Sequence, residues 1–224
     1  MRLKLIAGGT LSREIGFLSA ACPNTLDITW LQQEERTPPS LMGKSLQQAI
    51  DAAEDCQVHY DAIAVGAGLW EVWAALPKEG PDGSAVSPVH SERYPLIVPR
   101  AHDSVTLLLG SKERYREFVG HHDGICWLTP GRMERGFRPE QPDLPGGCST
   151  AVYIKNDDIF QPDWREEAQS AARCLHWDFE ELPGNLRLLR NLLWGSWDEE
   201  DFLTLLPGQR LRPSLGRQIV EIAR

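Results

Sequence analysis

The stretch LKLIAGGT, residues 3–10, decides the class of fold. An apolar run from Leu3 to Ala7 has the length of a buried strand, and two glycines follow it directly. Thr10 then stands where a helix N-cap is expected, ahead of a segment that places three apolar residues on one helical face, namely Leu11, Ile15 and Leu18. The stretch therefore predicts a strand, a tight turn and a helix.

The same alternation repeats along the chain. Further strands are predicted at 26–31, 62–65, 95–99, 125–128, 152–154 and 202–206. Helices are predicted around 46–53 and 69–76, from 103, again from 111, around 168–175, and at 185–194. A further segment at 178–182, between the last two helices, continues the alternation less clearly. Strands that alternate with helices, each a nearly continuous apolar run, indicate a parallel sheet covered on both faces. We expect a doubly wound, mostly parallel α/β sheet, a Rossmann-like three-layer sandwich.

The length of 224 residues fits one domain spanning 1–224. Two segments, 78–93 and 131–148, are rich in Gly, Pro or Ser and predict irregular loops. Each has two interpretations, a mobile lid or a solvated surface loop, of which the surface loop is favoured.

Charge and hydropathy exclude several classes of partner. The formal net charge of −9 disfavours electrostatic capture of nucleic acid or of an anionic membrane surface. No window approaches the roughly 18 apolar residues of a membrane-spanning helix, and the apolar run at the start is too short for a signal peptide. We expect a soluble, cytoplasmic protein whose partner is a small molecule or another protein.

The cysteines do not form a recognisable framework. There are five of them, an odd number, and no two are spaced as Cys-x-x-Cys. This pattern argues against a set of disulfides and against a local zinc knuckle, and it favours small core residues for most of them.

Four polar or glycine-rich clusters follow predicted strands. They are Gly8-Gly9-Thr10, Gly66-Ala67-Gly68, Arg100-Ala101-His102-Asp103 and Thr129-Pro130. Ligands of open α/β sheets bind beyond the carboxyl ends of the strands, where helix N-termini and loop amides converge. The glycines permit positive φ and close approach of a ligand to the backbone, although two tight strand-to-helix turns explain them equally well.

The cluster at 100–103 contains the residue types that acid–base chemistry needs. Arg100 is predicted to anchor a carboxylate or phosphate, and His102 is the candidate general acid or base. Asp103 is either the carboxylate that orients this histidine or a helix cap. A structural histidine is the competing interpretation.

The segment PRAHDSVTLLLGSKERY, residues 99–115, resembles the hallmark of the family called domain of unknown function 1638. Residues 6–15, 127–131, 186–189 and 195–198 agree with the same family, so the resemblance covers nearly the whole chain. The family pattern has cysteines at the ends of the first, third and fourth strands, and here Gly8, approximately Gly68, and Ser104 hold those places. The resemblance implies a member that lacks a thiolate-bound metal or iron–sulfur site, and it identifies no other cofactor.

These observations lead to one hypothesis and two alternatives. We expect the protein to bind a small polar or anionic metabolite at the carboxyl ends of the strands, through the residues Gly8, Gly9, Thr10, Gly66, Gly68, Arg100, His102, Ser104 and Thr129. The resemblance implies an accessory role beside a corrinoid-dependent methyltransferase in one-carbon metabolism, with a protein of that system as a partner. The alternatives are a non-catalytic subunit or scaffold, and a metal-dependent enzyme that uses His102, Asp103 and either His121 or His122.

Overall fold

The first sheet of the protein has five strands, four of them parallel. A computed structural model describes residues 1–31, 39–69, 78–79, 85–137, 147–159, 162–214 and 218–223. The strands are β1 (Arg2–Gly8), β2 (Thr25–Leu31), β3 (Ala62–Gly66), β6 (Leu96–Pro99) and β10 (Phe202–Leu205), and their order is β10-β6-β3-β1-β2. β1 is parallel to β2 and β3, and β3 is parallel to β6, whereas β10 pairs antiparallel with β6.

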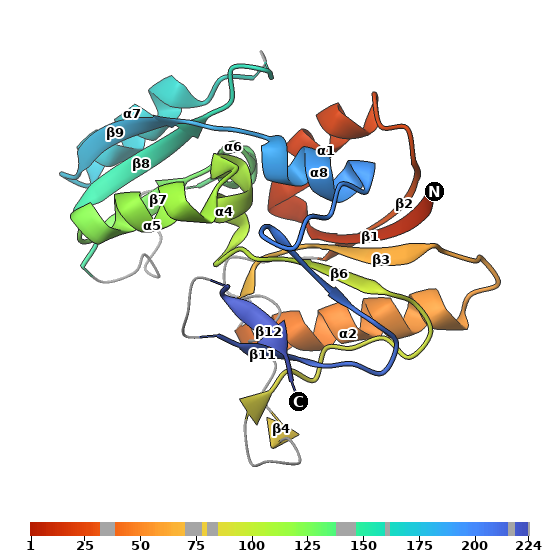
Figure 1. Cartoon of the computed structure of the whole chain (residues 1–224). Coiled ribbons are helices and arrows are strands. Elements are labelled where there is room, and N and C mark those ends of the chain that lie inside the picture. Colours follow the sequence, from red (N-terminus) through yellow and green to blue (C-terminus); the bar gives the residue numbers. More distant parts are fainter. Residues whose placement is uncertain are drawn as a thin grey trace.

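Helices cover both faces of this sheet (Figure 1). One face packs against α1 (Ser12–Ser19), α4 (Ser104–Leu109) and α8 (Arg187–Trp194), and the other against α2 (Pro39–Asp55). The alternation of β1 explains this arrangement, because Leu5 enters the core under α1 and α8 while Ile6 enters the core under α2. The short 3-10 helix η1 (Gly9–Leu11) leads from β1 into α1.

A second, separate sheet has three parallel strands. It consists of β7 (Ile125–Leu128), β8 (Thr150–Lys155) and β9 (Asp178–Pro183), with β8 in the centre. The helices nearby are α5 (Lys112–His121), α6 (Pro130–Glu134) and α7 (Arg165–Cys174). Ala168, Ala171 and Ala172 of α7 bury one face of this sheet, in a core of its own.

The opposite face of the second sheet joins the first core. Trp127 and Leu182 pack against the cluster that contains α4 and α8, and Ile154 is buried within it. The chain changes sheets at Gly110, which has φ +70° and ends α4. A Cβ at Gly110 would lie 2.6 Å from the carbonyl oxygen of Asn185, so only glycine fits this turn without strain.

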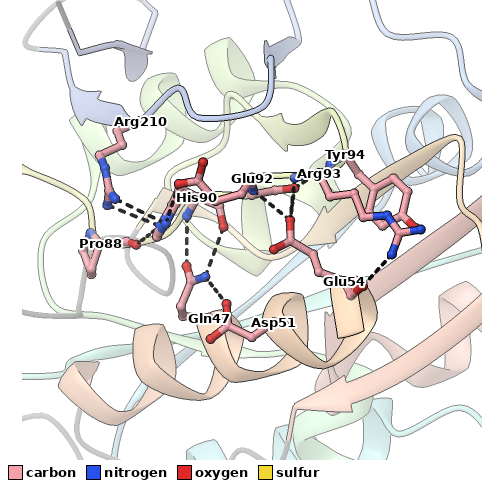
Figure 2. Close-up of polar contacts among 10 residues, drawn as sticks. Gln47, Asp51, Glu54, Pro88, His90, Glu92, Arg93, Tyr94 and Arg210 are labelled. Carbon is pink, nitrogen blue, oxygen red and sulfur yellow. Dashed lines mark hydrogen bonds and ion pairs between the residues drawn. The ribbon is translucent and has the colours of Figure 1, made fainter. Parts of the chain in front are cut away.

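Two small hairpins complete the described structure. β11 (Leu211–Pro213) pairs with β12 (Val220–Ile222), and β4 (Lys78–Glu79) pairs with β5 (Ala85–Val86). The segment 87–94 that follows β5 is irregular but firmly attached to α2, as Figure 2 shows. Glu54 Oε1 accepts hydrogen bonds from Ser91 Oγ at 2.6 Å and from the backbone amides of residues 92 and 93 at 2.8 and 2.9 Å.

The structure confirms the mixed α/β class with a mostly parallel central sheet, and every predicted strand lies on an observed one. It does not confirm a single three-layer sandwich, because the strands at 125–128 and 150–155 form the second sheet and β10 runs antiparallel. The helix predicted at 69–76 lies outside the described residues apart from Leu69. The segment 131–148 begins inside α6, and its residues 138–146 also lie outside the described part.

Among the five cysteines, which are all free, only Cys126 is fully buried. Cys22, Cys56 and Cys148 are partly buried and pack against the cores, and Cys174 is exposed. Four of the five cysteines therefore contribute to a core, as expected, although three of them are only partly buried. No helix within the described ranges is long and apolar enough to cross a membrane.

Candidate functional site

The glycines predicted at the strand ends make close contacts within the protein. The strand order reverses between β1 and β3, which is where an open α/β sheet normally offers its crevice. A Cβ at Gly66 would lie 2.6 Å from the Cβ of Ala7, and one at Gly68 would lie 2.3 Å from the Cα of Asp103. Neither glycine has positive φ. The glycines therefore let neighbouring backbone segments meet, and a cysteine side chain at residue 68 would not fit this backbone.

The turn after β1 packs against the helix that follows β7. A Cβ at Gly131 of α6 would lie 1.9 Å from the carbonyl oxygen of Thr10, and one at Gly9 would lie 1.9 Å from an Arg135 guanidinium nitrogen. Thr129 caps α6, because its Oγ1 accepts a hydrogen bond from the backbone amide of Arg132. The predicted ends of β1 and β7 thus come together, although they belong to different sheets.

Arg100 is directed at the C-terminal segment. Its guanidinium donates hydrogen bonds to the backbone carbonyls of Glu199 at 2.9 Å and Gln218 at 3.1 Å, and to that of Val220. The residue is buried, and burial lowers the pKa of its guanidinium. These contacts hold β12 beside the end of β6, and the role of Arg100 as an anchor for a ligand stays a prediction.

His102 lies half-buried beside two residues of α5. Its ring stacks on Tyr115 with centroids 5.2 Å apart, and Arg116 Nε donates to His102 Nε2 at 3.3 Å. Burial, followed by the charge of Arg116, lowers the pKa of His102, so the neutral ring predominates at pH 7. A hydrogen bond from arginine to Nε2 places the ring proton on Nδ1.

Asp103 is a helix cap, one of its two predicted roles. Its Oδ1 accepts from the backbone amide of Thr106 at 3.0 Å, and its Oδ2 accepts from the hydroxyl of Tyr115 at 2.9 Å. In the described structure it makes no hydrogen bond to His102. Ser104 begins α4 next to this cap and is partly exposed.

The described residues contain no group of three or more His, Cys, Asp or Glu side chains arranged to hold a metal ion. The Nδ1 atoms of His121 and His122 contact carbonyl oxygens of their own helix, at 2.6 and 2.9 Å, and His122 Nε2 lies 3.4 Å from Glu180 Oε1. The geometry thus does not bring these histidines together with His102 and Asp103 as a ligand set.

A pocket of about 310 Å³, lined mostly by polar residues, opens between α1 and the second sheet. It lies between the first turn of α1, the first residue of α6 and the carboxyl end of β8. Its lining residues are Arg13, Pro130, Tyr153, Lys155, Asn156, Asp157, Ile159 and Asp163. The carboxyl end of a parallel strand is the expected place for a ligand, but the strand concerned belongs to the second sheet.

Arg13 and Asn156, which line this pocket, carry buried donors. Arg13 Nη2 donates to the carbonyl of Ile159 at 3.2 Å, and Nη1 lies 3.5 Å from Glu134 Oε1. Arg13 Nε and Nη1 and Asn156 Nδ2 are all buried, and none makes a hydrogen bond of good geometry with a described residue. Buried donors are almost always paired, and the buried carboxyl group of Glu14, which interacts with both Arg13 and Asn156, is the neighbouring acceptor.

Glu14 lies beside these donors with no exposed surface. No hydrogen bond of good geometry reaches its carboxyl oxygens from the described residues. Burial raises the pKa of Glu14 and outweighs the donors around it, namely its own backbone amide, the charge of Arg13 and the amide of Asn156, which lower the pKa, while the charge of Glu134 raises it. The raised pKa favours the neutral, protonated carboxyl.

The family model for a protein of unknown function, DUF1638, matches residues 30–193, which is more than half of the chain. The protein belongs to the DUF1638 family. No curated protein and no solved structure matches the chain. The region that matches the DUF1638 model includes β7, β8 and the pocket residues from 130 to 163, whereas Arg13 and Glu14 precede it.

Sequence reasoning missed the pocket of this DUF1638 protein, although two signals pointed to it. Glu14 stands three residues after Leu11 and one before Ile15, so it lies on the apolar stripe of its helix, where a carboxylate is out of place. Asn156 and Asp157 follow the predicted strand at 152–154 after one residue, Lys155, close to the position that drew attention to the other four strand ends. None of the residues predicted to bind a ligand lines this pocket, although one of them, Thr129, is the neighbour of Pro130 in the chain.

Proposed function

We propose that this DUF1638 protein binds a small anionic metabolite in the pocket between α1 and the second sheet. The observation that carries the proposal is the position of Arg13, whose largely buried side chain lines a pocket of about 310 Å³ at the carboxyl end of β8. A guanidinium presents fixed N–H donors that match the oxygens of a carboxylate or phosphate. Asn156 also lines this pocket.

The surroundings of Arg13 strengthen an interaction with an anion. Only 11% of its side chain is exposed, so an anion that reaches it leaves water and is screened little. Tyr153, which is 2% exposed, forms part of the wall, and burial raises its pKa to about 12, so it stays a neutral phenol. The pocket therefore offers donors to an anion without a competing phenolate.

Thermal unfolding in the presence of small anions tests this proposal. Acetate, succinate, inorganic phosphate and sulfate are the probes, at matched ionic strength. We expect at least one of them to raise Tm in a saturable manner, because a ligand that binds only the folded state stabilises it. Arg13→Ala is expected to abolish this increase, and Arg173→Ala, which removes an exposed arginine on α7, is expected to retain it. Equal effects of all probes on both variants would contradict the proposal.

The other expectations derived from the sequence remain proposals. An accessory role in corrinoid-dependent methyl transfer and a cytoplasmic location follow from the family resemblance and from composition. The helices on both faces of the first sheet support a Rossmann-like classification of that part of the chain, in which strand ends serve ligands.

A further inference from the structure

The outer edge of β2 forms one margin of the first sheet. β2 is the last strand in the order β10-β6-β3-β1-β2, and its seven residues pair one to one with Arg2–Gly8 of β1, without a bulge. No other strand in the described part of the chain pairs with it. Alternate backbone N–H and C=O groups of such an edge point away from the sheet, so a further strand can pair with them.

The sequence of this edge lacks the features that usually prevent such pairing. Soluble proteins protect edge strands with proline, with lysine, with a bulge or by making the strand very short. The segment TLDITWL at 25–31 has none of these. Its one charged residue is Asp27, whose Oδ1 accepts a hydrogen bond from Lys4 Nζ at 2.9 Å, so the charge of this carboxylate is balanced within the same sheet.

Apolar side chains lie along the same strand. The register with β1 places Leu26, Ile28 and Trp30 on the face of the sheet that packs against α1 and α8. Leu26 and Ile28 are only partly buried there, and 39% of Trp30 is exposed. The apolar surface of the sheet therefore continues to its margin, where a further strand would remove it from water.

We infer that β2 pairs antiparallel with β2 of a second copy of this chain, about a two-fold axis that lies between the two Ile28 residues. The sequence of the strand is complementary to itself in this register. Leu26 lies opposite Trp30 of the partner subunit, so apolar side chains meet apolar ones. Asp27 lies opposite Thr29 of the partner subunit, whose hydroxyl donates to the carboxylate, and the two-fold axis repeats both contacts. A register centred on Asp27 would instead place two carboxylates opposite each other.

Sedimentation equilibrium of the full chain over a range of protein concentrations tests the inference. We expect a reversible dimer with a dissociation constant on the order of 10 µM at about 0.15 M salt, because one strand edge buries less than the roughly 1,200–2,000 Å² of a stable interface. Each copy carries a net charge of −9, so the two copies repel each other. Lowering the salt to about 0.01 M is therefore expected to weaken the dimer several-fold.

Matched substitutions locate the interface. Trp30→Lys is expected to weaken the dimer by about tenfold or more, because its ammonium would lose water opposite the partner's Leu26. Val119→Lys, at a residue of α5 with the same 39% exposure, should leave the dimer unchanged. A chain that stays monomeric at every concentration, or a dimer that Val119→Lys weakens as much as Trp30→Lys does, would overturn the inference.

Two substitutions at Thr29 test the register. Thr29→Glu places a second carboxylate opposite Asp27 and is expected to weaken the dimer, whereas Thr29→Lys places an ammonium there and should not weaken it. Equal effects of the two substitutions would contradict the proposed pairing. None of these outcomes bears on anion binding, because the pocket is lined by other residues.

Discussion

Glu14 is the least exposed ionisable residue in the part of the chain that the structure describes. It lies fully buried on α1, beside Arg13, Glu134 and Asn156. Because burial raises the pKa of Glu14 above the ordinary value of 4.5, the folded state holds this proton more tightly than the unfolded state does. The contribution of the Glu14 proton to the free energy of unfolding is therefore fully present below pH 4.5 and is lost as pH rises through the pKa of Glu14 in the folded protein.

Glu14→Gln is expected to remove this loss. The variant should gain stability relative to the unmodified protein as pH rises from 4.5, by at most about 1.4 kcal/mol per pH unit. Urea unfolding at several pH values between acid and neutral measures the difference. A difference that stays constant over that range would show that Glu14 ionises in the folded protein as it does in water.

For Arg100 we predict a structural role, in the stability of the fold and not in ligand binding. Arg100→Ala removes three hydrogen bonds to backbone carbonyls and leaves those acceptors without their charged donor. We expect a loss of about 2–4 kcal/mol in the free energy of unfolding, with anion binding unchanged. Chemical denaturation and a parallel anion titration measure the two quantities. A variant that kept its stability and lost anion binding would restore Arg100 as the ligand anchor.

At the scale of elements, one carboxylate makes three of the hydrogen bonds that attach segment 87–94 to α2. Glu54 Oε1 accepts from Ser91 Oγ and from two backbone amides, next to the contacts between Gln47 and His90 that Figure 2 also shows. This segment leads directly into β6, so its position sets where that strand begins.

Glu54→Ala is expected to lower the free energy of unfolding by about 1–3 kcal/mol, because the two amides and the hydroxyl lose a charged acceptor. Asp55→Asn is the matched control, as Asp55 is exposed and is the last residue of α2, next to Glu54. Urea denaturation of both variants checks the prediction. Equal stability of the two variants would mean that water replaces Glu54 without loss.

The individual elements were predictable because their signals are local. Apolar runs marked the strands, and the helices predicted from 103 and from 111 begin there, capped by Asp103 and Ser111. The cap expected at Thr10 is wrong, because Thr10 lies within η1 and α1 begins without a side-chain cap. The division into two sheets was not predictable, because it depends on which strand pairs with the second edge of β6, the edge that does not pair with β3. That partner is β10, more than a hundred residues away, and the αL turn at Gly110 sends the chain to the second sheet.

The candidate site shows the same limit at the residue scale. Arg100, His102 and Asp103 were singled out because they follow a strand, but their partners are a C-terminal hairpin, Arg116 and Tyr115. Arg13 and Asn156 line the same pocket only because elements of the two sheets pack together, and no spacing in the sequence encodes that arrangement.

For the whole molecule, the shared core predicts that the two sheets unfold together. Ile154 of β8 is buried in the cluster that also contains Leu3, Ala64 and Leu189. Hydrogen exchange should therefore give β3 and β8 amides opening free energies that agree within about 1 kcal/mol. If β8 opened far more easily than β3, the two sheets would be independent units, and the expectation of one domain would fail.

An NMR titration of arginine Nε–Hε resonances with acetate tests directly whether the guanidinium of Arg13 receives the carboxylate of a ligand in the pocket beside α1. Arg13→Lys assigns the signal. We expect the Arg13 resonance to shift and saturate, while those of exposed arginines such as Arg173 do not. An Arg13 resonance that does not move, or one that moves only as much as the others, would contradict it.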